Sequence, residues 1–292
     1  MDKIIFGDNQ FFGINHMSED KAAEQQMRFR DLKEIIKVID SAYACGIRGF
    51  MFNTHDKVAA ICEHFRANPS KYADLRLYPS LPYAHKYANA VAEKGLLATL
   101  NEFVISNSSA GEIVSTLFRG GKGVLTRDAV EIMKILVDLE LKIFRGLNVQ
   151  HIFLQNIVTD LLLGAGANWM LAEFAQHIRK KHGVDAAFNS MNMPALVDSL
   201  LAAGVDNPIV CSSINKIGYL MSPGRESYEK ALAEKPFRPI AMSILASGAV
   251  NPAEAIEYVT ALPNIQSIVF GASSAGNIGS TCTLIRKFWP DA

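Results

Sequence analysis

The sequence lacks the features that mark several classes of protein. Its 292 residues include only four cysteines, which lie far apart and form no CxxC pair. A disulfide framework and a structural zinc site are therefore not expected. Lys and Arg together number 29, as do Asp and Glu, so the formal net charge is zero. Without a basic face to neutralise phosphates, the chain is not expected to bind nucleic acid.

Long apolar runs are also missing. No run approaches the roughly 20 residues of a membrane-spanning helix, and the start, MDKIIFGDNQ, has no apolar signal region. We therefore expect a soluble cytoplasmic protein that makes no membrane contact. Because 49% of its residues are hydrophobic, the chain can bury a large core.

What the sequence does contain is an alternation of short apolar segments with amphipathic ones. Helical patterns such as 31–46, which ends at Gly46, and 194–204, which has proline at its start and glycine at its end, lie between the apolar segments. This alternation predicts a parallel sheet, and eight units of this length fit a closed α/β barrel, the (β/α)8 or TIM barrel. The predicted strands are 3–8, 47–53, 75–81, 150–156, 185–190, 208–213, 239–245 and 267–273.

The barrel is expected to form one domain over residues 1–292, because no interdomain linker is visible. The segment 86–149 is larger than a normal crossover, so we predict an enlarged helical insertion or cap between the third and fourth strands. An open doubly wound sheet is the alternative architecture. The absence of a GxGxxG motif after an early strand disfavours it.

Polar residues follow the predicted strands at the end where such barrels carry their chemistry. Their amides, hydroxyls and carboxyl predict a polar site for a small-molecule substrate rather than an apolar socket. The substrate-binding candidates are Asp8, Asn9, Asn53, Tyr83, Gln155, Asn156, Asn189 and Ser213.

The stretch 52-FNTHDK-57 supplies the first catalytic candidates. His55 is a natural general acid/base near neutral pH, and Asp56 is placed to orient it. The alternative is that both residues only cap the helix that starts at Lys57. Three supporting candidates follow other strands, where they could also be solvated: His16, His85 and Lys86.

Lys216 in 211-CSSINKIGYL-220 is a further catalytic candidate. A lysine in a dry pocket has a lowered pKa and can attack a carbonyl to form an imine. The alternative is a lysine on a solvated loop.

A metal site is not predicted, because the sequence has no HxH or HExxH motif. Histidines on helices or strand starts, namely His64, His151, His177 and His182, are expected to be structural. The glycines of 119-RGGKG-123 match no phosphate loop and predict a turn.

Several segments resemble the aldo/keto reductases. The stretch 239-PIAMSILASG-248 is similar to their seventh strand, 264-NIQSIVFGASSAGNI-278 to their last strand and cofactor-side helix, and 187-AFNSMNMPAL-196 to their strand-five turn. The stretch 208–220 is likewise similar to their strand-six segment, and 6–13 is loosely similar to their opening glycine turn. The resemblance implies a (β/α)8 barrel with NADPH-dependent carbonyl reduction, and cofactor contacts at Ser273 and Ser274.

The catalytic tetrad of that family is not reproduced. Its Asp position falls on Asn53, its His position falls on Gln155, and its Lys position falls in 77–81, which has no lysine. No tyrosine lies in 54–65, and the aromatic residue that stacks on nicotinamide in the family corresponds to Lys216.

We therefore expect an enzyme that acts on a small polar metabolite bearing a carbonyl or hydroxyl group. The expected chemistry is proton transfer or C–C/C–O cleavage, of the lyase or isomerase type. The alternatives are an NADPH-dependent reductase with a rearranged site and a non-catalytic ligand-binding protein. No cofactor is the first expectation, NADPH or a divalent metal is the alternative, and the oligomeric state is left open.

Overall fold

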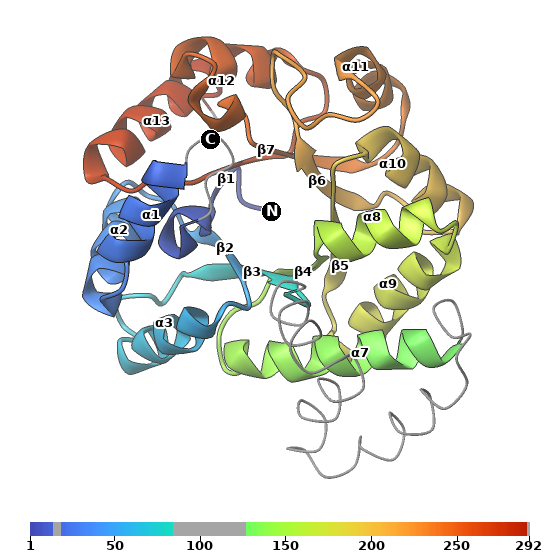
Figure 1. Cartoon of the computed structure of the whole chain (residues 1–292), viewed down its shortest axis with the longest axis horizontal. Coiled ribbons are helices and arrows are strands. Elements are labelled where there is room, and N and C mark those ends of the chain that lie inside the picture. The colour runs from blue at the N-terminus through green and yellow to red at the C-terminus, as the bar shows by residue number, and fades with distance from the viewer. Residues whose placement is uncertain (14–18, 84–126, 291–292) are drawn as a thin grey trace.

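The fold is a ring of parallel strands surrounded by helices (Figure 1). The computed structural model describes residues 1–13, 19–83 and 127–290. Eight strands form one closed barrel in sequence order. They are β1 (Ile4–Phe6), β2 (Gly49–Asn53), β3 (Arg76–Leu81), β4 (His151–Leu154), β5 (Asp185–Ser190), β6 (Ile209–Ser213), β7 (Arg238–Met242) and β8 (Ser267–Phe270).

The first and last strands close the sheet. In β1, Ile5 lies opposite Gly49 of β2 on one side and opposite Val269 of β8 on the other. All the neighbouring strands are parallel, as expected when helices make the return connections. The (β/α)8 prediction is therefore confirmed, and the open doubly wound alternative is wrong because an open sheet would leave β1 and β8 unpaired.

The predicted strand starts agree with the structure to within two residues, but the ends of four strands were set too late. The fourth strand stops at Leu154 instead of residue 156. The seventh strand stops at Met242 instead of residue 245, because Ser243 has a φ of 53° and cannot continue an extended chain. The first strand stops at Phe6 and the last at Phe270. The residues that follow these strands turn into loops at the barrel mouth, which frees their side chains for a site.

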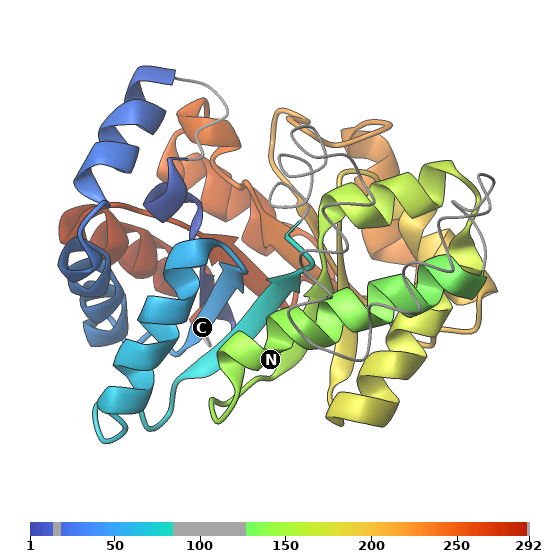
Figure 2. The ribbon, with the colours of Figure 1, turned by 60° about the horizontal axis from the view of Figure 1, so that its bottom comes forward.

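Helices cover the outside of the barrel, and α7 and α9 pack side by side in both views (Figures 1 and 2). The insertion predicted over 86–149 is described only from residue 127, so its first part, with the turn at 119–123, lies outside the described residues. The helices are α1 (Glu19–Arg28), α2 (Leu32–Ala44), α3 (Asp56–Ala67), α7 (Arg127–Leu141), α8 (Asn156–Gly164), α9 (Asn168–His182), α10 (Met193–Ala202), α11 (Arg225–Glu234), α12 (Pro252–Ala261) and α13 (Ala275–Phe288), with short 3-10 helices η1 (Asn9–Phe12), η3 (Lys142–Phe144) and η4 (Ala246–Gly248).

Local sequence explains where several helices begin. Asp31 caps α2 by accepting a hydrogen bond from the Lys33 amide at 2.9 Å, and Asn251 caps α12 by accepting one from the Ala253 amide at 3.0 Å. Each cap satisfies an N–H group that has no partner inside the helix. No helix in the described part of the chain has the length and apolar character needed to cross a membrane.

The barrel has two apolar layers. One layer lies between the strands and the surrounding helices and contains residues such as Phe6, Phe50 and Phe188. The other fills the barrel interior with buried side chains from every strand. Its members are Ile5, Met51, Tyr78, Phe153, Ala187, Ile209, Cys211, Ile240 and Val269. The barrel is thus a packed core and not a pore.

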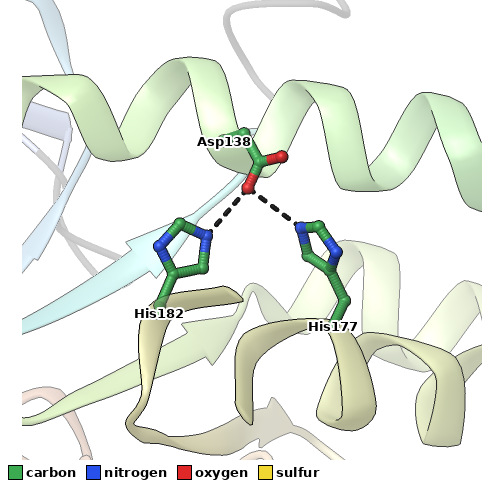
Figure 3. A group of neighbouring side chains, drawn as sticks. All are labelled: Asp138, His177 and His182. Atoms are coloured by element: carbon green, nitrogen blue, oxygen red, sulfur yellow. Dashed lines mark hydrogen bonds and ion pairs between the residues drawn. The ribbon is translucent and has the colours of Figure 1, made fainter. Parts of the chain in front are cut away.

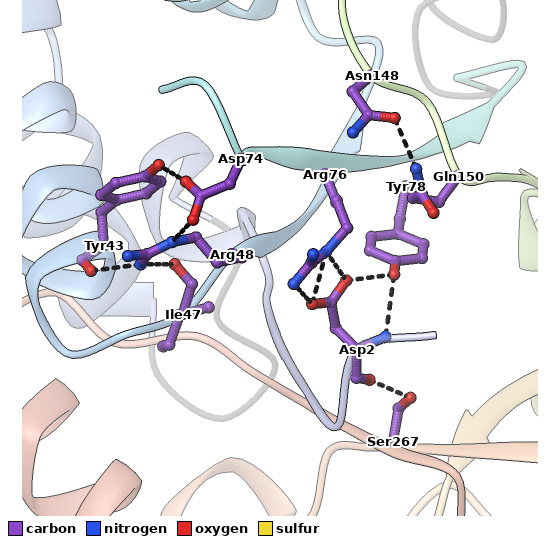
Figure 4. Close-up of polar contacts among 10 residues, drawn as sticks. All are labelled: Asp2, Tyr43, Ile47, Arg48, Asp74, Arg76, Tyr78, Asn148, Gln150 and Ser267. Atoms are coloured by element: carbon purple, nitrogen blue, oxygen red, sulfur yellow. Dashed lines mark hydrogen bonds and ion pairs between the residues drawn. The ribbon is translucent and has the colours of Figure 1, made fainter. Parts of the chain in front are cut away.

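A network of polar contacts holds the N-terminal face of the barrel together (Figure 4). The Asp2 carboxylate accepts hydrogen bonds from the guanidinium of Arg76 and the hydroxyl of Tyr78, both on β3. The carbonyl of Asp2 accepts a hydrogen bond from Ser267 at the start of β8. These contacts tie the N-terminus to two strands, so this face has a stabilising role while the opposite face is open for chemistry.

We predict that Ile240→Ala, inside the barrel, lowers the free energy of unfolding by about 2–5 kcal/mol because it leaves a cavity in a packed layer. The matched change Ile217→Ala removes the same atoms from a side chain that is 57% exposed and should cost about 0.5 kcal/mol or less. Urea denaturation measures both values. Equal losses in the two variants would contradict this description of the core.

Candidate active site

A cavity of about 440 Å³ opens at the C-terminal ends of the strands, a size typical of small-molecule sites. The end of each strand or the loop that follows it contributes to the wall, so the whole barrel positions the site. The described lining residues are Gly7, Asp8, Asn9, Gln10, Gln25, Met51, Asn53, Ser80, Tyr83, Gln155, Asn156, Ile157, Asn189, Met191, Leu220, Met242, Ser243, Ile244, Leu245, Ser247, Gly248, Val269, Phe270 and Gly271.

Asp8 is the carboxyl group of this wall. It follows β1 by two residues and is only 3% exposed. Its two carboxylate oxygens accept hydrogen bonds from Asn53, one from the backbone N–H at 2.6 Å and one from the side-chain amide at 3.1 Å. Burial raises the pKa of Asp8 from 3.8 to about 7, although the hydrogen bonds from Asn53 act in the opposite direction. The group can therefore exist in both protonation states near neutral pH.

Two amide pairs surround this carboxyl. Gln155 donates from Nε2 to the Asn53 side-chain oxygen at 3.2 Å, which orients the amide that donates to Asp8. Asn189 donates from Nδ2 to the Ser80 hydroxyl at 2.8 Å. The Asn189 side-chain oxygen is buried and has no partner among the described residues. Since buried polar atoms are usually paired, this oxygen is suited to bind a donor on a ligand.

Tyr83 adds a phenol to the wall directly after β3. Its backbone N–H donates to the buried Glu140 carboxylate on α7 at 2.9 Å, and the same oxygen accepts a hydrogen bond from Thr54. Burial raises the pKa of Tyr83, and the nearby carboxylates of Asp8 and Asp56 raise it further. The phenol therefore keeps its proton at neutral pH and can donate it to a ligand oxygen.

His55 and Asp56 do not line the described cavity wall. His55 is the N-cap of α3, and its Nδ1 accepts a hydrogen bond from the Lys57 amide at 3.3 Å. Its ring stacks on Phe12 with 4.1 Å between the ring centroids and an interplanar angle of 11°. Asp56 is exposed and is the first residue of the helix. The capping interpretation thus describes His55, and Asp56 lies in the first turn of the helix.

Lys216 also lies outside the wall. Its ammonium group forms an ion pair with Glu254, and both side chains are about half exposed. A lysine that forms an imine at neutral pH needs a dry pocket or a cationic neighbour, whereas the Lys216 ammonium is half exposed and paired with a carboxylate. The remaining catalytic candidates, His16, His85 and Lys86, are outside the described residues.

The binding candidates divide into two groups. Seven of them line the cavity, and their roles in binding stay predictions. Ser213 is instead fully buried, with its hydroxyl 3.7 Å from the Met191 sulfur. Ser273 is also absent from the described wall, and Ser274 caps α13 by accepting a hydrogen bond from the Asn277 amide at 3.3 Å. The seven binding candidates that line the cavity are Asp8, Asn9, Asn53, Tyr83, Gln155, Asn156 and Asn189.

Three contributors to the site were not assigned a role from the sequence. Glu140 lies in a helix 57 residues beyond Tyr83, and no motif links the two. Gln10 donates from Nε2 to the Gly7 carbonyl at 2.8 Å, and its side-chain oxygen lies 2.2 Å from where a Cβ of Gly271 would be. A side chain at position 271 would therefore displace the Gln10 amide, a contact that becomes visible only when β1 and β8 are adjacent.

The wall constrains which cofactor could be held. Among the described lining residues Asp8 is the one carboxyl group, and none is histidine, cysteine, lysine or arginine. This set lacks the nitrogen and sulfur ligands of a zinc site. With no cationic side chain in the described wall, a phosphate group would have to be bound by backbone N–H groups. The candidate segment is the bend from Ser243 to Gly248. Positive φ angles at Ser243, Ala246 and Ser247 give the backbone a shape in which N–H groups can point to one anion.

We predict that Asp8 makes stability depend on pH. Its folded-state pKa lies above the ordinary value of 3.8, so between these values the folded protein holds a proton that the unfolded chain releases. The contribution of Asp8 to the free energy of unfolding therefore falls by up to about 4 kcal/mol as the pH rises from about 4 to about 7, and is constant above that. Asp8→Asn should remove this slope in urea denaturation, whereas Asp206→Asn, at an exposed position, should keep it. Parallel pH profiles for wild type and Asp8→Asn would contradict the assignment.

Comparison with known proteins supports the fold and not a closer relationship. No family model and no curated protein matches the sequence. A Pseudomonas aeruginosa protein provisionally named an aldo-keto reductase is 10% identical with a TM-score of 0.61, covering 98% of this chain and 90% of that one. An aldo-keto reductase of the silkworm Bombyx mori is 8% identical with a TM-score of 0.57, covering 97% and 79%. An aldo/keto reductase from Brucella melitensis is 10% identical with a TM-score of 0.51, covering 97% and 87%. The chain therefore has the (β/α)8 barrel fold of the aldo-keto reductases.

Proposed function

We propose that this chain is an enzyme that transfers a proton on a small polar metabolite bearing a carbonyl or hydroxyl group, as lyases and isomerases do, with Asp8 as the general acid/base. The observation that carries the proposal is the buried Asp8 carboxyl in the cavity wall, whose pKa is raised by burial to about 7. A general acid/base is most effective when its pKa is near the working pH. A pKa displaced this far in a cavity is also typical of functional groups.

The neighbours of Asp8 fit roles in such a reaction. The ionised carboxylate accepts a proton from a carbon next to a carbonyl, and the electron pair moves toward the carbonyl oxygen. A donor is then needed at that oxygen, and the Tyr83 phenol is a described lining group that can supply one. In isomerisation, the protonated Asp8 returns the proton to the former carbonyl carbon, while the proton of the neighbouring hydroxyl passes to the former carbonyl oxygen and a new carbonyl forms. In elimination, the carbonyl reforms as an oxygen leaving group departs from the next carbon, and Asp8 protonates that oxygen.

The wall also favours one charge class of substrate. The described lining side chains around Asp8 are neutral amides and hydroxyls, and no described cation lines the wall to pair with a second carboxylate or a phosphate. A neutral, hydroxyl-rich substrate fits these groups. The unpartnered oxygen of Asn189 selects a donor, such as a substrate hydroxyl, because a substrate without one would leave this oxygen unpaired.

His55 and Asp56 are the competing assignment for the acid/base pair. The His55 side chain is engaged at the start of α3, where it stacks on Phe12 and caps the helix. We propose that His55 positions this loop and that Asp8 carries the proton. Substitution of each residue separates the two assignments.

A reductase is the second candidate function. The named structural neighbours are aldo-keto reductases, and the segment that resembles their seventh strand, through Ser243 and Gly248, lines the same cavity. In such an enzyme a nicotinamide cofactor would supply a hydride. A binding protein without catalysis is the third alternative, and a ligand bound without turnover would favour it.

We predict that the protein exchanges carbon-bound hydrogen of its substrate with solvent. Neutral sugars, polyols and hydroxycarbonyl compounds would be incubated with the enzyme in D2O, and deuterium incorporation would be followed by NMR. Asp8→Asn should lower the exchange rate by about 10²–10⁴-fold, the usual contribution of a general acid/base. His55→Ala should retain most of it. Loss of exchange in a folded His55→Ala with full activity in Asp8→Asn would reverse the assignment.

We further predict that NADPH does not bind with an affinity useful for catalysis. The described wall has no cationic side chain to pair with the phosphates of NADPH. Fluorescence titration should therefore show no saturation at NADPH concentrations up to about 1 mM, the upper end of ordinary KM values. Saturation in the micromolar range, followed by substrate-dependent oxidation of NADPH, would make the reductase the correct function.

A further inference from the structure

A second group of chemically reactive side chains lies outside the barrel, between α7 and α9. Asp138 is on α7, and His177 and His182 are on the last two turns of α9. Figure 3 shows both imidazole rings pointing from α9 to the same carboxylate oxygen on α7. None of the three residues belongs to the described cavity wall, so the group is separate from the candidate active site.

The geometry brings three metal-ligating atoms together. The Nε2 atoms of His177 and His182 lie 2.9 and 2.8 Å from Oδ1 of Asp138, and the three ligand atoms are all within 4.8 Å of one another. Their side chains are 14–23% exposed, so solvent reaches the group while the surrounding helices limit its motion. The other oxygen, Oδ2, accepts a hydrogen bond from Lys181 at 2.6 Å.

We propose that Asp138, His177 and His182 form a binding site for a divalent transition metal such as Zn²⁺, with a solvent water as the fourth ligand. Two imidazole nitrogens and one carboxylate oxygen are a ligand set that zinc accepts, with bonds of about 2.0–2.2 Å. Tetrahedral bonds of this length place ligand atoms about 3.3 Å apart, so Oδ1 needs to move about half an ångström away from each ring. The two Nε2 atoms, which lie within 4.8 Å of each other, need to reach the same separation.

The exchange of protons for metal is balanced. In the metal-free protein each Nε2 carries a proton that it donates to Oδ1. When Zn²⁺ binds to neutral imidazoles, these protons move to Nδ1 or to solvent, and the two lone pairs at Nε2 bind the ion. Lys181 can remain on Oδ2, which keeps the carboxylate monodentate.

A metal here would join α9 to α7, the helix that contacts Tyr83 of the cavity wall. Glu140 lies two residues after Asp138 in α7 and accepts the hydrogen bond from the Tyr83 backbone at 2.9 Å. Fixing Asp138 to α9 would therefore hold the part of α7 that supports Tyr83. We assign the site a structural role, because its ligands do not reach the cavity.

The test uses the full-length chain without a histidine tag, stripped with EDTA and dialysed. Equilibrium dialysis against Zn²⁺ should give one equivalent bound with micromolar or tighter affinity, and saturating Zn²⁺ should raise Tm by about 5 °C. Co²⁺ should give the visible absorption bands of a four-coordinate site.

Three variants locate the binding. His177→Gln keeps an N–H that can donate to the carboxylate but removes a metal ligand, and Asp138→Asn removes the charged ligand. Each should weaken Zn²⁺ binding by about 100-fold or more and abolish the rise in Tm. The control is His64→Ala, because His64 contacts Tyr72 at 3.2 Å on another face of the barrel and its loss should leave binding unchanged.

Tm and circular dichroism of each variant in EDTA show whether the fold is retained, and His177→Gln provides a folded variant if Asp138→Asn is unstable. No binding at about 100 μM Zn²⁺, or equal binding in wild type and both ligand variants, would overturn the proposal. The second result would mean that other residues hold the metal.

Discussion

The pairing of β1 with β8 is the contact on which the site depends. Gly7 donates from its backbone N–H to the Phe270 carbonyl at 2.9 Å, and Ile268 donates to the Lys3 carbonyl at 2.9 Å. These bonds join the two ends of the chain and close the sheet, so that Asp8 faces a cavity with strand ends on every side. In an open sheet the same carboxyl would lie at an edge and be solvated. Its raised pKa, and with it the proposed acid/base role, is therefore a consequence of barrel closure.

Burial of Asp8 has a cost that the rest of the barrel offsets. An ionised carboxyl without a cation is unfavourable in a buried position, even with two hydrogen bonds from Asn53. The packed interior layer below it and the Asp2–Arg76 ion pair on the opposite face stabilise the fold without neutralising the carboxyl. The protein with Asp8 ionised is less stable, but the same burial provides a group that can act as an acid or base near neutral pH. Such a compromise between stability and activity is common at active sites.

The barrel could be predicted from the sequence because strand and helix patterns are local, and segments such as 185–190 end where β5 ends. The chemistry of the site depends on longer-range effects. His55 attracted attention because imidazole titrates near neutral pH without help, whereas the pKa of a carboxyl depends on burial, which the sequence does not display. The helix-capping role of His55 and the ion pair of Lys216 with Glu254 likewise follow from tertiary contacts. The approach of Glu140 to Tyr83 joins residues 57 positions apart and has no local signal.

The residues at the positions of the aldo/keto-reductase tetrad are consistent with a site organised around Asp8. Where the resemblance places Asp and His, this chain has Asn53 and Gln155, and the structure joins them in one hydrogen-bonded series from Gln155 to Asn53 to Asp8. An aspartate at position 53 would bring a second carboxylate to about the distance of that hydrogen bond from Asp8, and like charges so close cannot both ionise. An amide instead donates to Asp8 and accepts from Gln155. A neutral strand end at position 53 therefore suits the proposed proton-transfer group after β1. It also illustrates why a shared fold does not carry over the reaction.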